Sequence, residues 1–142
     1  MKKAIYLFQY FVLFFLAVGC KDKTLIEPPI KEFLNTLWTL ESFDVEGEVV
    51  TPPKDQIYTI QFKNDSTFSG KSDCNDIWGH YTLGQNHSLT ISNLVTTKKG
   101  CGEKSMGERY FEALLVVKSY RIDTNKLSIY YGQNSKLNFI DK

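Results

Sequence analysis

The residues suited to chemistry gather around the middle of the chain. Asp73, Cys74, Asp76 and His80 lie close together in the sequence, and Cys101 follows. Such side chains can bind a metal ion, and a pair of thiols can act in redox exchange or close a disulfide. Neither cysteine belongs to a C-x-x-C motif or has a histidine at a recognised metal-ligand offset. Catalytic and phosphate-binding motifs are also missing. The sequence therefore predicts no enzyme, no metal site and no cofactor.

The first twenty residues have the three parts of a secretory signal. Lys2 and Lys3 are followed by an apolar stretch, residues 4–18, which falls short of the roughly 20 residues of a spanning helix. The stretch ends in Leu-Ala-Val-Gly-Cys at 16–20, which resembles a lipobox, where the cysteine thiol is lipidated. We expect residues 1–19 to be a signal peptide and Cys20 a lipid-anchored terminus. The alternatives are an uncleaved anchor or an ordinary cleavage site beside a cysteine.

The anchor sets the expected compartment and the start of the domain. Residues 20–34 are charged, contain two prolines and predict a tether, so residues 35–142 form the domain. We expect a bacterial envelope protein held in the outer membrane and facing the periplasm. Lys21-Asp22 partly resembles a surface-export signal, which makes display at the cell surface the alternative.

Lipidation of Cys20 explains why the chain has an odd number of cysteines. It leaves Cys74 and Cys101, and outside the cytoplasm such a pair most simply forms a structural disulfide. A redox-active or metal-binding pair is the competing interpretation.

The remaining polar candidates have plain structural interpretations. His87 lies in a predicted turn and His80 in a strand without a visible partner. Asn75 is expected to hydrogen-bond to backbone beside the disulfide, and Asp73 and Asp76 to be solvated turn residues.

Composition limits the classes of function. The 142 residues have room for one domain, and with 42% hydrophobic and 23% charged residues they are not a disordered chain. A net charge of +1 provides no basic field for nucleic acid.

Period-two alternation between turn residues predicts short antiparallel strands. Tyr58, Ile60 and Phe62 share one face of the clearest example. The expected strands span residues 37–45, 58–63, 67–70, 77–83, 88–94, 120–122, 127–131 and 137–140. The spacing of the apolar residues changes from a period of two to a helical period in one segment only. Met106, Tyr110, Ala113, Leu114 and Val117 recur at helical spacing, and the segment 105–108 predicts a capping box in which Ser105 accepts from the amide of Glu108.

The mature chain resembles the META/HslJ domain family over about residues 35–140. The matching residues include a W-x-L opening, an F-S-G segment, a C-N…G-x-Y centre and a segment resembling T-x-x-x-C, at Trp38-Thr39-Leu40, Phe68-Ser69-Gly70, Cys74 to Tyr81 and Thr96 to Cys101. The resemblance implies a half-open β-barrel with a helix, an envelope lipoprotein, no agreed enzymatic activity and, for some members, a link to heat shock. It also supports pairing Cys74 with Cys101.

Together these features predict a mainly β (α+β) domain, a small antiparallel half-open barrel or curved sheet with one packed helix. Most of its aromatic residues should fill the core. Trp78, Tyr81, Tyr130 and Tyr131 are the candidates for a binding surface, and adjacent Tyr130 and Tyr131 must face opposite ways. We expect a monomeric, non-catalytic lipoprotein that binds or stabilises another envelope protein. A carrier or sensor of a small hydrophobic ligand is the alternative, and it requires an apolar cavity between helix and sheet.

Overall fold

Alternating apolar residues form the strands, and turn residues separate them, as the sequence predicts. The computed structural model describes residues 33–141. The predicted signal peptide, Cys20 and nearly all of the predicted tether lie outside the described residues. The elements are β1 Trp38–Val45, β2 Glu48–Val50, β3 Tyr58–Phe62, β4 Thr67–Ser72, β5 Asn75–Leu83, the 3-10 turn η1 Gln85–His87, β6 Leu89–Thr96, α3 Gly107–Leu115, β7 Val117–Asp123, β8 Lys126–Tyr131 and β9 Ser135–Asp141.

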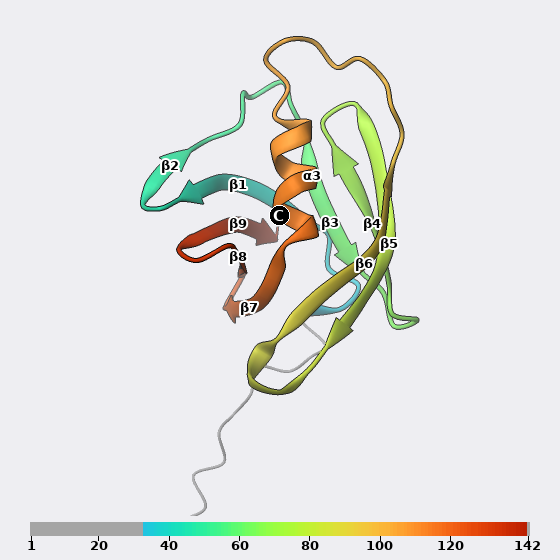
Figure 1. The fold of residues 1–142 in the computed structure, drawn as a ribbon, viewed down its shortest axis with the longest axis vertical. Coiled ribbons are helices and arrows are strands. Elements are labelled where there is room, and N and C mark those ends of the chain that lie inside the picture. The colour runs from blue at the N-terminus through green and yellow to red at the C-terminus, as the bar shows by residue number, and fades with distance from the viewer. Residues whose placement is uncertain (1–32, 142) are drawn as a thin grey trace, which may run out of the picture.

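The strands form one antiparallel sheet that curls into a half-open barrel (Figure 1). Their order is β6-β5-β4-β3-β1-β9-β8-β7, with β2 paired to the far end of β1. The two end strands meet near a single bridge between Ser88 and Ser119. Helix α3 lies against β4 and β6, inside the curl of the sheet. The predicted fold class is confirmed.

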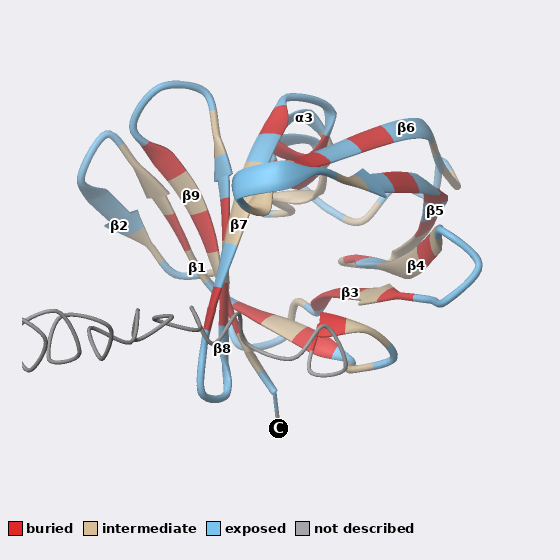
Figure 2. Cartoon of the chain, turned by 90° about the horizontal axis from the view of Figure 1, so that it is seen from below, coloured by how far each residue is buried: buried red, intermediate tan, exposed pale blue. Residues whose placement is uncertain are grey.

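The concave side of the sheet holds an aromatic core (Figure 2). Tyr110 on α3 packs edge-on against Tyr58 and Phe43, with ring centroids 5.4 and 6.4 Å apart. Phe33 is fully buried and accepts a hydrogen bond at its carbonyl from the Trp38 indole at 3.3 Å. The packed domain therefore includes Phe33, which the sequence analysis assigned to the tether.

The helix is where predicted, but its first amides have different partners. Ser105 accepts from the amide of Gly107 at 3.2 Å, so the predicted capping box with Glu108 is wrong. The hydroxyl of Tyr58, on β3, accepts from the amide of Met106 at 2.8 Å. The amide of Met106 therefore donates to a residue distant in sequence, whereas in many helices a nearby capping side chain accepts from such an amide.

Other differences concern element boundaries. The short strand β2 was not predicted; it is too short to show alternation. Val117 begins β7 and is not part of the helix. Strands β4 to β9 extend beyond the predicted segments by one to three residues at one or both ends. Asp76, predicted to be in a turn, lies in β5.

Candidate functional site

The four aromatic residues predicted to bind lie in separate places. Trp78 is on the outer face of β5 and is 44% exposed, whereas Tyr81 points into the core and its hydroxyl donates to the carbonyl of Lys63 at 2.6 Å. Tyr130 on β8 is 37% exposed, and Tyr131 faces the other way and is half-buried. Four strands separate β5 from β8 in the order of the sheet, and Tyr130 does not line the hollow that Trp78 borders, so the two residues do not share a site.

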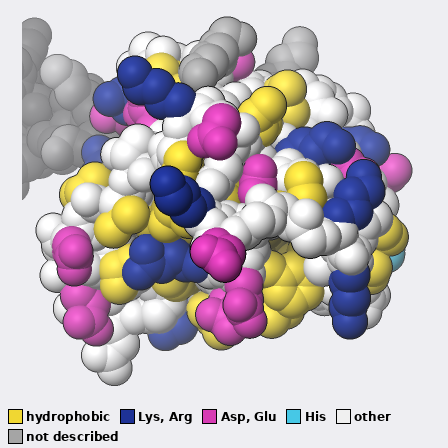
Figure 3. All heavy atoms as spheres, turned by 90° about the horizontal axis from the view of Figure 1, so that it is seen from above, with side chains coloured by type: hydrophobic (Ala, Val, Ile, Leu, Met, Phe, Trp, Pro, Cys, Tyr) yellow, Lys and Arg dark blue, Asp and Glu magenta, His cyan; other side chains and the backbone are white. Residues whose placement is uncertain are grey.

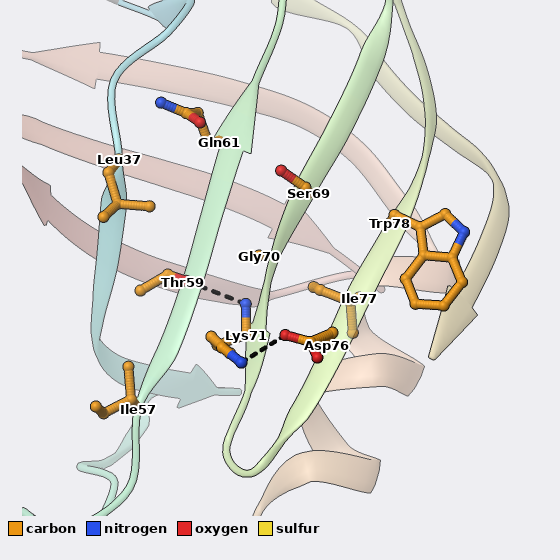
Figure 4. Close-up of a pocket in the computed structure, with 10 residues that line it drawn as sticks. All are labelled: Leu37, Ile57, Thr59, Gln61, Ser69, Gly70, Lys71, Asp76, Ile77 and Trp78. Carbon is orange, nitrogen blue, oxygen red and sulfur yellow. Dashed lines mark hydrogen bonds and ion pairs between the residues drawn. The ribbon is translucent and has the colours of Figure 1, made fainter. Parts of the chain in front are cut away.

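Trp78 forms one wall of a hollow on the convex side of the sheet, which we call the outer-face groove (Figure 4). Its volume is about 500 Å³. Leu37 and Ile57 form the opposite wall, and they are 53% and 58% exposed. The lining residues are Leu37, Ile57, Thr59, Gln61, Ser69, Gly70, Lys71, Asp76, Ile77 and Trp78.

The floor of the groove follows from strand register. Gln61 lies opposite Ser69, and Ser69 opposite Trp78, so these side chains form a row across β3, β4 and β5. Beside them, a β-carbon at Gly70 would lie 2.0 Å from the carbonyl oxygen of Thr59. Only glycine allows β3 and β4 to approach this closely.

One ion pair lies within the groove. Lys71 Nζ is 2.5 Å from Asp76 Oδ1, and both side chains are about half exposed. The pKa of Asp76 is lowered, first by the hydrogen bond from Lys71 and also by the charges of Lys71 and Lys99. Desolvation by burial raises this pKa but does not outweigh them. Exposed ion pairs contribute little to stability, so this pair can exchange partners.

A second hollow, the loop hollow, has about 560 Å³ and lies between the loop before α3 and the β4–β5 turn. Its lining includes Ser72, Asn75, Thr96, Thr97, Lys98, Lys99, Cys101, Ser105, Glu108 and Phe111. Beside it, Cys74 and Cys101 form a disulfide with their Cα atoms 5.5 Å apart.

Asn75 holds the loop beside that disulfide. Its Oδ1 accepts from the amide of Lys99 at 2.7 Å and from the hydroxyl of Thr97 at 2.8 Å. Its Nδ2 donates to the carbonyl of Lys99 and to Sγ of Cys101, both at 3.1 Å. The expected bonding to backbone is present, and it joins two segments distant in sequence.

The other polar candidates do not converge. His80 is exposed on β5, and His87 packs against the ring of Tyr120 at 5.6 Å. Asp73 adopts a positive φ of 59° in its turn, and its Oδ2 is buried without a hydrogen bond to the described residues, so it is not the fully solvated carboxylate predicted. Within residues 33–141 no group of histidines, cysteines and acids is arranged to hold a metal ion, and no helix could cross a membrane.

Comparison with known proteins agrees with this architecture. The META domain family matches residues 31–142, most of the chain. The chain belongs to the META domain family. This family is not known for an enzymatic activity. A search of curated proteins finds no match.

Solved structures share the fold of this META domain. A protein from Burkholderia xenovorans has a TM-score of 0.66 at 18% identity, over 79% of this chain and 85% of its own. A DUF4847 family protein from Bacteroides vulgatus has a TM-score of 0.60 at 20% identity, over 80% and 96%.

Sequence reasoning found Trp78 but missed the residues opposite it in the groove. The signal was present as pairs of adjacent apolar residues, Leu37-Trp38, Ile57-Tyr58 and Ile77-Trp78. In a strand only one member of such a pair can face the core, so the other must face outward. The outward members, Leu37, Ile57 and Trp78, all line the outer-face groove.

Proposed function

We propose that this META domain is a lipid-anchored, non-catalytic protein of the bacterial envelope that binds another envelope protein through the outer-face groove. The carrying observation is that Leu37, Ile57 and Trp78 are exposed around one hollow. Apolar side chains gathered at a polar rim are typical of protein-binding surfaces.

The alternative of a hydrophobic-ligand carrier has less support. It requires an apolar cavity between α3 and the sheet, and core side chains pack in that place. Tyr110 contacts the rings of Phe43, Tyr58 and Phe139, and Ala113 and Leu114 are buried beside it. A ligand there would have to displace well-packed aromatic residues, which is costly.

Surface charge also favours a protein partner over nucleic acid. Seen from above, acidic and basic side chains are interspersed, with hydrophobic ones between them (Figure 3). This face therefore lacks the continuous basic surface that nucleic-acid binding needs, and a net charge of +1 provides little positive charge for one.

Site-specific cross-linking in living cells tests the proposal. A photoreactive amino acid at position 78 should form an adduct with one envelope protein, which mass spectrometry then identifies. The matched control is the same replacement at Tyr130, another exposed aromatic residue on a distant strand. The purified partner should bind the wild-type chain and not the Trp78→Ser variant. Equal adducts at both positions, or adducts with lipid alone, would contradict the proposal.

The anchor needs its own test. Mass spectrometry of the amino-terminal peptide should find acyl chains on Cys20, and Cys20→Ser should release the protein from the membrane fraction. An unmodified Cys20 in a membrane-bound protein would contradict lipidation without affecting the groove.

A further inference from the structure

The spacing of the apolar walls restricts what can fill the outer-face groove. Trp38 pairs with Ile60, which places Leu37 at the level of Gln61, in the row that continues through Ser69 to Trp78. That row crosses three strand spacings. Since neighbouring strands lie about 4.8 Å apart, the walls are roughly 14 Å apart.

An extended chain lying across the strands matches this distance. It advances about 3.3 Å per residue and turns alternate side chains to the same side, so residues four apart face the same way at roughly 13 Å. Two apolar side chains with this spacing would contact Leu37 at one end of the row and Trp78 at the other. The residue midway between them would also face the groove.

The floor can bind the backbone of such a segment. The Ser69 hydroxyl has no hydrogen bond to the described part of the chain. Gln61 uses its Nε2 on the carbonyl of Asn35 at 2.9 Å, which leaves its Oε1 as an acceptor. A donor-acceptor pair in the middle of an apolar groove fits the amide groups of an extended peptide better than a lipid chain, which offers no partner.

The charged residues at the groove indicate which residue the bound segment has midway between its two apolar side chains. Lys71 lies beside the row and binds Asp76, and Lys99 acts on the same carboxylate. Lys71 and Asp76 are the charged residues that line the groove, and they balance each other; Lys99, from the loop hollow, adds one positive charge near Asp76. A lysine ammonium has three donors, so Lys71 can hold Asp76 and an incoming carboxylate together.

We infer that the outer-face groove takes an extended acidic segment of a partner protein, with two apolar side chains four residues apart and a carboxylate midway between them on Lys71. This inference rests on the proposed function and names the chemistry of its partner.

Peptide binding to the full mature protein tests the inference through tryptophan fluorescence. The chain has two tryptophans, and Trp38 is buried while Trp78 is exposed, so the change on binding comes from Trp78. The probe is a blocked peptide of about nine residues, with two leucines four apart, a glutamate midway and serine or threonine elsewhere. A Trp78→Phe variant should lose the signal.

Three comparisons isolate the features of the probe. Replacing the glutamate by glutamine should weaken binding about tenfold, with less difference at high salt. Placing the leucines three residues apart should weaken binding similarly, because one leucine then faces away. Lys71→Glu should reverse the preference so that a lysine-centred peptide binds better, a reversal that a purely structural role for Lys71 would not cause.

Each outcome decides between occupants. Equal binding of the glutamate and glutamine peptides, or indifference to leucine spacing, would overturn the inference. A Trp78 response to vesicles of phosphatidylglycerol with no response to peptide would overturn it in favour of a membrane surface. If cross-linking at position 78 finds a protein while peptides fail, the proposed function stands and only the partner chemistry is wrong.

Discussion

The two hollows of this domain are similar in size but differ in how far their side chains are bonded within the fold. In the loop hollow, Asn75 uses all four of its hydrogen-bonding positions on residues 97–101, beside the Cys74–Cys101 disulfide. In the outer-face groove, Leu37, Ile57 and Trp78 remain exposed and Ser69 is unpartnered among the described residues. The polar residues of the loop hollow therefore hold the fold together. The apolar residues of the outer-face groove have no such role, and their surface is available to the proposed partner. The comparison predicts that loop-hollow variants lose stability and groove variants lose binding.

The disulfide should give the largest loss. Cys74→Ser with Cys101→Ser opens a loop with a sequence separation of 27 residues. The chain-entropy model gives a cost of about 3–4 kcal/mol. For a domain of this size the melting temperature should fall by more than about 12 °C in circular dichroism. Peptide binding to the groove, measured below that temperature, should be unchanged. A variant that melts like the wild type would show that the bridge does not constrain the loop.

Asn75→Ala should come next, with a loss of about 2–3 kcal/mol, because it leaves the amide and carbonyl of Lys99 without their partners. Urea unfolding measures the loss. Asn75→Asp is the matched control, since it keeps the acceptor for Lys99 and Thr97 and removes only the donors. It should lose less. Equal losses would mean that the two donated bonds, to Lys99 and Cys101, matter more than the two accepted bonds.

Strand and core positions could be predicted from this sequence because alternation and turn residues are local signals. Tyr58, Ile60 and Phe62 face inward as expected, and all are buried. The helix cap could not be predicted, because the hydroxyl that accepts from Met106 belongs to Tyr58, 48 residues away. Likewise, the adjacent apolar pairs showed that some residues must face outward, but only the register of β3, β4 and β5 places them around one groove. Burial of Tyr81 depends in the same way on the curl of the sheet.

Alkaline pH should destabilise the tyrosine-rich core. Burial raises the pKa of Tyr58, Tyr81 and Tyr110 above their ordinary value. Tyrosine becomes charged on losing its proton, so above about pH 10 the unfolded chain releases protons that the folded chain retains. The contribution of these protonated tyrosines to the free energy of unfolding is therefore fully present below about pH 10 and declines above it. For Tyr110 the decline is about 1.4 kcal/mol per pH unit. Unfolding measured from pH 8 to 11 checks this slope.

Tyr110→Phe separates this effect from general alkaline damage. The variant loses a hydrogen bond to the carbonyl of Thr59 at 3.2 Å, so it should be somewhat less stable at neutral pH. Its stability should nevertheless decline less steeply above pH 10. An unchanged slope would mean that Tyr110 does not stay protonated in the folded state.

Trp78→Ser should change stability least, within about 0.5 kcal/mol, because the ring is 44% exposed and the core does not depend on it. Tyr130→Ser, at a similarly exposed aromatic position, should behave alike in urea unfolding. The two variants should differ only in partner binding, which Trp78→Ser alone abolishes. A large stability loss at position 78 would make Trp78 a structural residue, and the groove would then resemble the loop hollow. If stability is unchanged and binding is lost, an exposed tryptophan that folding does not require is explained by the partner it contacts.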